Sequence, residues 1–208
     1  MFWNSLGFMF FSTIETISIY YLIMALFRFK ASSHIWEALF VVLLINLQSY
    51  VLRNEFSLSF LVPMIAILIL IFLFAVIVKI PLIWSVITTI LGFAIFGFMQ
   101  TGLAILLFGS IAGAQSTTSN GYLLQFASGT ITILISLFLY RFGWGFKFDF
   151  ERLRFKFEDI LVIILIILFL VFISIVLYYN EIFIITLFFV STVVFLLYYA
   201  LGKERGER

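Results

Sequence analysis

The chain has 208 residues, of which 65% are apolar and only 11% are charged, and its mean hydropathy is +1.28. These values lie far outside the range of soluble globular domains and indicate an integral membrane protein. The formal net charge of +2 is too small and too scattered to indicate a nucleic-acid-binding protein. The absence of cysteine excludes disulfides, thiolate metal sites and a thiol nucleophile.

Apolar segments follow one another along the whole chain, separated by short polar breaks. A membrane-spanning helix needs about 20 apolar residues, and this length predicts seven spans, at residues 6–27, 35–52, 58–78, 82–108, 122–140, 160–178 and 182–201. Six spans is the competing count, if the last two segments form a re-entrant hairpin. Because no linker interrupts the pattern, we predict one domain over residues 1–208, an all-α polytopic transmembrane helix bundle.

Basic residues fall almost entirely on one side of this topology. With the N-terminus outside, eleven of the 12 Lys and Arg residues lie in inner segments, and Arg53 is the only one outside. Basic segments are retained in the cytoplasm during membrane insertion, so the asymmetry predicts an external N-terminus and a cytoplasmic C-terminus. The short outer loops are typical of a multi-pass protein of the bacterial plasma membrane. The inner segment 141–159 interleaves aromatic and charged residues, and we expect it to lie in the membrane interface.

Glu15 is the most unusual residue of the first span, because it lies nine positions into it. At 1.5 Å per residue it is roughly 13 Å below the outer boundary of the membrane. A carboxylate at this depth costs roughly 2.5–3.5 kcal/mol on insertion scales and should face the interior of a helix bundle. We expect Glu15 either to contact a ligand, an ion or a proton, or to hold helices together through hydrogen bonds.

Amide side chains share the outer half of the membrane with Glu15. Asn46 and Gln48 lie roughly 9 and 6 Å from the outer end of the second span, and Gln100 lies roughly 12 Å from the outer end of the fourth. Gln125 lies just inside the fifth span. These positions predict a polar pocket that is open to the exterior and has Glu15 at its floor. The alternative is a set of independent interhelical hydrogen bonds.

Two features stand near the expected mouth of this pocket. Arg53 is a candidate contact for an anionic ligand, or a loop charge that pairs with its neighbour Glu55. The polar stretch 109–121 is expected to be a loop and to cover the pocket as a lid.

No motif for catalysis or metal binding stands out. His34 is the single histidine and lies near Glu37, but one imidazole and one carboxylate do not make a metal site. Ser110, in the stretch GSIAG, has no base on its own side of the membrane. We therefore expect no metal, no cofactor and no enzymatic activity.

The predicted spans are rich in Phe, Ile and Leu, the outer loops are very short, and a basic-aromatic inner loop at 141–159 precedes a last helical pair at 160–201. In this gross pattern the chain resembles the membrane sensor half of agr-type peptide-pheromone receptor histidine kinases, the group with a GHKL-type ATPase domain. The resemblance implies sensing of a peptide or lipophilic signal. No phosphoacceptor-His helix and no ATP-binding domain are present, so we expect no kinase activity.

Three functions compete on these grounds. The first is a non-enzymatic membrane protein that binds an external peptide or lipophilic ligand and relays the change to a cytoplasmic or membrane protein partner. The second is a transporter or channel subunit that uses Glu15 to contact an ion or substrate, which requires a polar route through the inner half. The third is a structural membrane subunit of a larger complex. All three place the chain in a lipid bilayer, and none involves nucleic acid.

Overall fold

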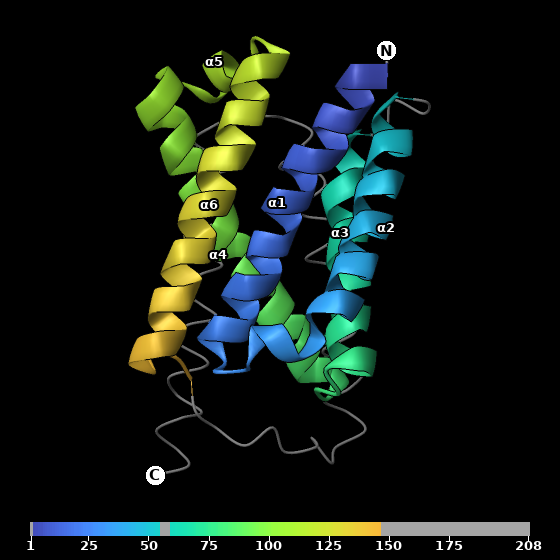
Figure 1. Ribbon diagram of the computed structural model, residues 1–208, viewed down its shortest axis with the longest axis vertical. Helices are drawn as coiled ribbons and strands as arrows, with labels where there is room; N and C mark the ends of the chain where they lie inside the picture. Colours follow the sequence, from blue (N-terminus) through green and yellow to red (C-terminus); the bar gives the residue numbers. More distant parts are fainter. Residues whose placement is uncertain (1, 55–58, 147–208) are drawn as a thin grey trace.

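The computed structural model describes residues 2–54 and 59–146, which form a bundle of long helices (Figure 1). No strand occurs among the described residues, so the predicted all-helical fold class is confirmed. The helices occur in the order α1 (Phe2–Leu26), η1 (Ala31–His34), α2 (Ile35–Asn54), η2 (Ser59–Leu61), α3 (Val62–Phe72), η3 (Leu73–Ile77), α4 (Leu82–Phe108), α5 (Ile111–Gln115) and α6 (Thr118–Phe142). Here η1 and η2 are 3-10 helices and η3 is a π-helix.

Five helical segments in the described part of the chain are long and apolar enough to cross a membrane. They are Leu6–Leu26, Ala31–Arg53, Ser59–Ile77, Leu82–Phe108 and Thr118–Phe142. Their bounds agree with the first five predicted spans to within a few residues, which is compatible with a multi-pass membrane protein. The predicted spans 160–178 and 182–201, and positions 147–159 of the predicted inner segment, lie outside the described residues.

The stretch predicted as a polar loop at 109–121 folds largely into helix. α5 occupies its centre, and α6 begins before its end. Ser110 and Thr117 cap these two helices, because each side chain accepts a hydrogen bond from the backbone N–H three residues later. The polar residues that predicted a loop are thus helix caps. α6 also continues further than predicted, so Arg141 lies in its last turn.

α1 lies at the centre of the bundle and contacts α2, α4 and α6. It meets α4 and α6 at glycines: a Cβ on Gly92 would lie 2.2 Å from Ile23 Cγ1, and a Cβ on Gly129 would lie 2.8 Å from Ile14 Cγ2. The face of α6 around Gly129 carries further small, buried residues, namely Ser128, Thr132 and Ser136. Small residues let transmembrane helices approach closely, so this part of the α6 sequence fixes its contact with α1.

An apolar core fills the half of the bundle that contains the C-terminal end of α1. Its largest side chains include Tyr20, Phe74 and Trp84, each buried. The rings of Tyr20 and Phe74 stack with their centroids 6.0 Å apart. The Tyr20 hydroxyl donates a hydrogen bond of 2.8 Å to the carbonyl of Ala31, which ties α1 to the turn before α2. This core separates the polar interior described below from one end of the bundle.

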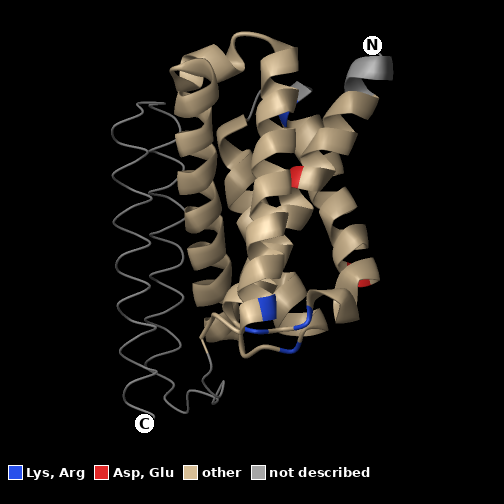
Figure 2. Cartoon of the chain, turned by 60° about the vertical axis from the view of Figure 1, so that its left-hand side comes forward, with Lys and Arg blue, Asp and Glu red and all other residues tan. Residues whose placement is uncertain are grey.

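The two ends of the bundle differ in charge (Figure 2). Of the five Lys and Arg residues in the described part, Arg53 lies at the end where α1 begins. We call this end the Arg53 end, and the opposite one the basic end, because the other four lie there, namely Arg28, Lys30, Lys79 and Arg141.

α1 and α6 run in the same direction and are joined where they reach the basic end. The Arg28 guanidinium donates a hydrogen bond to the carbonyl of Gly143. The Phe146 N–H donates a hydrogen bond of 2.8 Å to the carbonyl of Leu26. Gly143 ends α6 with a φ of 66°, a left-handed conformation that favours glycine. The two helix ends are therefore one connected unit.

A methyl group added at Gly129 should destabilise the bundle. The new Cβ would lie 2.8 Å from Ile14 Cγ2 and 3.1 Å from the Ile14 carbonyl oxygen, so α1 and α6 would have to separate. Overpacking of this kind costs about 1–3 kcal/mol, and we expect Gly129→Ala to lower the midpoint of thermal unfolding in detergent. Gly102→Ala is the matched control, because a Cβ there meets nothing within 4 Å. A midpoint for Gly129→Ala equal to that of the control would contradict this packing.

Candidate functional site

Two adjacent cavities lie in the half of the bundle toward the Arg53 end. The first has a volume of about 330 Å³ and is lined by α1, α2, α3, α4 and α5. The second, of about 460 Å³, is lined mainly by α4, α5 and α6. Both volumes are in the range of small-molecule sites, roughly 300–1,000 Å³. The residues that line both cavities are Glu15, Arg53, Gln100, Thr101, Ile111 and Gln115.

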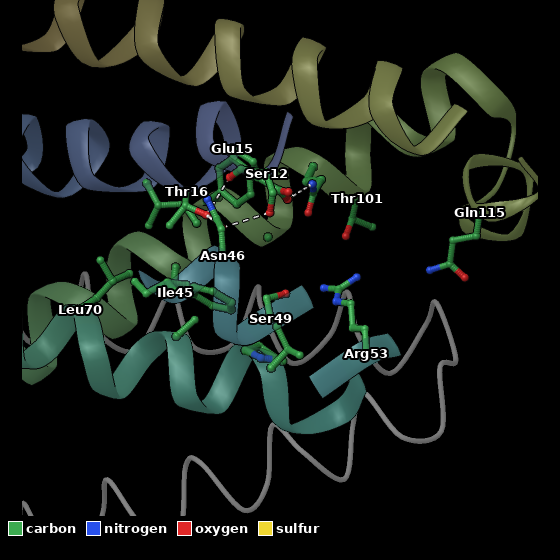
Figure 3. Close-up of a pocket in the computed structure, with 18 of the residues that line it drawn as sticks. Ser12, Glu15, Thr16, Ile45, Asn46, Ser49, Arg53, Leu70, Thr101 and Gln115 are labelled. Carbon is green, nitrogen blue, oxygen red and sulfur yellow. Dashed lines mark hydrogen bonds between the residues drawn. The ribbon is translucent and has the colours of Figure 1, made fainter. Parts of the chain in front are cut away.

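Glu15 lines both cavities, and Figure 3 shows it in the first one. Its side chain is half-buried, and Gln100 of α4 donates a hydrogen bond of 2.5 Å from Nε2 to Glu15 Oε1. Gln125 lines the second cavity together with Glu15. No ion pair joins Glu15 to a basic side chain in the part of the chain that the structure describes. The carboxyl is therefore held by the Gln100 amide, with no described basic side chain in direct contact.

Asn46 is buried in the wall of the first cavity and binds α1 with both ends of its amide. Asn46 Oδ1 accepts hydrogen bonds from the hydroxyls of Ser12 at 3.1 Å and Thr16 at 3.0 Å. Asn46 Nδ2 donates a hydrogen bond of 3.0 Å to Thr13 Oγ1. Asn46 thus joins α1 to α2 through interhelical hydrogen bonds, which were the alternative prediction for this residue. It also lines the predicted pocket.

Gln48 lines neither cavity, unlike the other residues predicted for the site. It follows Asn46 by two positions, which places it about 200° further around an α-helix of 3.6 residues per turn. Its similar depth in the membrane therefore does not bring it to the same face of α2.

Arg53 stands in the last turn of α2, at the mouth of both cavities. Its guanidinium carbon lies 6.0 Å from the centroid of the Phe8 ring of α1, within the range of a cation–π contact. The side chain extends toward the opening lined by Thr101 and Gln115 (Figure 3). The predicted alternative, a pairing with Glu55, falls on a residue outside the described part of the chain.

Several lining residues were not predicted, above all Ser12, Thr16, Ser49, Thr101 and Gln115. A periodic signal marks three of them. Ser12 precedes Glu15 by three positions, Thr16 follows Ser12 by four, and Ser49 follows Asn46 by three. Polar residues at intervals of three or four share one face of a helix. Gln115 carries no such signal, because it belongs to the short helix predicted as a loop.

The described residues contain no group of three His, Cys, Asp or Glu that could hold a metal ion. Ser110 is occupied as the cap of α5. The described part of the chain is thus an all-helical bundle with five candidate membrane-spanning helices and cavities of mixed polarity toward one end. No protein-family model, curated protein or solved structure matches it.

Replacement of Asn46 by leucine should weaken the contact between α1 and α2. The three hydrogen bonds to Ser12, Thr13 and Thr16 would be lost, and interhelical hydrogen bonds in membranes contribute about 0.6–2 kcal/mol. We expect Asn46→Leu to unfold at a lower temperature in detergent than the wild type. Gln48→Leu makes the same change two positions away, outside the network, and should leave the midpoint close to the wild-type value. Equal midpoints for the two variants would show that the network does not stabilise the bundle.

Proposed function

We propose that this chain is a non-enzymatic membrane protein that binds an external peptide or lipophilic ligand in the two cavities and relays the binding to a partner at the basic end. The observation that carries the proposal is Glu15 in the middle of a candidate span, held by Gln100 and facing both cavities. An ionisable residue within a transmembrane segment marks a functional site by default.

The charge asymmetry supports a cavity on the external side. Arg53 stands at the mouth of the cavities, whereas the other described basic residues lie at the opposite end. Basic segments remain in the cytoplasm on insertion, so the proposal places the Arg53 end outside, in a plasma membrane.

α5 supports a role as a lid over the site. Ile111 and Gln115 line both cavities from this short helix. Gly109 precedes it with a φ of 74°, a conformation that glycine adopts without strain. A rotation at this point would move α5 away from the opening.

α1 provides a physical route for the relay. It carries Ser12, Glu15 and Thr16 at the cavities, and its far end is bonded to the end of α6 through Arg28 and Leu26. A ligand that displaces α1 would therefore displace the ends of both helices on the proposed cytoplasmic side. Such a relay requires the ligand to bind one of two helix arrangements more tightly than the other.

A transporter or channel subunit is the second candidate, because Glu15 could equally contact an ion or substrate in transit. Such a function needs a polar route through the basic half. Among the hydroxyls there, those of Ser85, Thr88, Thr89 and Ser136 are buried and donate hydrogen bonds to the backbone of their own helix or of the turn before it. This arrangement favours the binding function over transport. A structural subunit would need neither the cavities nor Glu15.

The absence of cysteine allows a direct test by single-cysteine labelling. Thr101→Cys should react with a membrane-impermeant thiol reagent added outside intact cells, because Thr101 lines both cavities. Thr89→Cys should stay unlabelled from either side, because Thr89 is fully buried in the other half. Labelling of Thr101→Cys only in inverted vesicles would place the cavity on the cytoplasmic side, and protection from both sides would refute an open cavity.

A measurement of solute flux across proteoliposome membranes distinguishes the binding function from transport. Proteoliposomes that contain the wild-type chain should show no flux of small ions or peptides above that of empty liposomes. A flux that is present in the wild type and abolished by Glu15→Ala would establish the transporter instead.

A further inference from the structure

We propose that the ligand is a small zwitterion, bound with its ammonium group at Glu15 and its anionic group at Arg53. This inference rests on the proposed function, since it names the chemical class of the ligand for the same two cavities.

The inner part of the site offers hydrogen-bond acceptors. Glu15 contributes a carboxyl group of which one oxygen is taken by Gln100. Gln125, which lines the second cavity together with Glu15, has a buried Oε1 that accepts no hydrogen bond from another described residue. An ammonium group carries three donors and no acceptor, so a carboxylate next to an unused amide oxygen matches its requirements.

The mouth of the site offers hydrogen-bond donors. The Arg53 guanidinium has donors only, and it forms no ion pair within the part of the chain that the structure describes. Thr101 and Gln115 face the same opening and can donate alongside it (Figure 3). A carboxylate or phosphate group suits these donors, because a guanidinium binds both in a bidentate manner.

The opposite charges of Glu15 and Arg53 favour a single ligand that carries both a cationic and an anionic group. Glu15 and Arg53 line the same two cavities and form no ion pair with each other. A ligand that carries only an anionic group would bind Arg53 and leave the carboxyl of Glu15 in the cavity without a cationic partner, which is costly. A ligand that carries only an ammonium group would leave the donors of the exposed Arg53 unused. Phe93 and Phe96 add apolar surface to the first cavity, where apolar parts of the ligand can pack.

Two sources provide this chemistry. One is a short peptide with free termini, which carries an ammonium and a carboxylate. The other is the headgroup of phosphatidylethanolamine, which carries an ammonium and a phosphate.

The first experiment uses dipeptides that differ only in charge. The full chain in detergent is heated with leucyl-leucine, with N-acetyl-leucyl-leucine, which lacks the cation, or with leucyl-leucinamide, which lacks the anion. A second series replaces them with micelles that contain phosphatidylethanolamine, its N-acylated form, or phosphatidylglycerol. In at least one series we expect the zwitterion to raise the unfolding midpoint at a concentration about tenfold lower than either singly charged compound. The series that responds identifies the source.

Variants assign each charge of the ligand to its residue. Arg53→Gln should make leucyl-leucine and leucyl-leucinamide equivalent, whereas Glu15→Gln should make leucyl-leucine and N-acetyl-leucyl-leucine equivalent. If the lipid series responds instead, Glu15→Gln should make phosphatidylethanolamine equivalent to its N-acylated form. Arg141→Gln, which removes a charge at the basic end, should keep the wild-type order of the compounds. Because Arg53 is exposed, its variant keeps the test valid even if Glu15→Gln does not fold.

The zwitterion is overturned if neither series favours it over its singly charged relatives, or if Arg53→Gln retains the full preference for a free carboxylate over the amide. Labelling of Thr101→Cys from outside is independent of these results. An accessible cavity with no preference for zwitterions would refute the ligand class alone, whereas an inaccessible cavity would refute the proposed function itself.

Discussion

The cost of polar groups inside a membrane governs this structure. Without water, each such group needs a partner within the protein. The carboxyl of Glu15 finds Gln100 on α4, and the hydroxyls of α1 find Asn46 on α2. Both partners bind groups of α1, and these contacts hold α1 at the centre of the bundle. The remaining helices are arranged around these contacts, with α6 fitted to α1 at Gly129.

The same requirement divides the bundle into two halves with different properties. Toward the basic end, large apolar side chains such as Trp84 fill the interior, and the hydroxyls of Thr88 and Thr89 donate hydrogen bonds to nearby backbone. Toward the Arg53 end, the polar side chains only partly satisfy one another and leave space between them. The proposed binding function requires such an arrangement, because a closed core next to the cavities keeps a ligand on the side from which it entered.

Hydropathy located the first five spans because the length of an apolar segment is set by the membrane. The depth of residues along the predicted spans was enough to place Glu15, Asn46, Gln100 and Arg53 in one region. In the structure all four line the same cavity. Depth alone carries no information on direction around a helix, which is why Gln48 was placed in the site and Thr101 was not. The helical fold of 109–121 was missed because capping residues and loop residues have the same composition.

The central position of α1 has a consequence for biosynthesis. α1 is made before α4, and the hydrogen-bond partner of its acidic residue follows 85 positions later, on α4. At roughly 5–20 residues per second, translation supplies that partner roughly 4 to 17 s afterwards. During this interval the insertion machinery or the growing chain must shelter the carboxyl. A product that ends before α4 would expose it permanently to lipid, which makes it a ready substrate for membrane quality control.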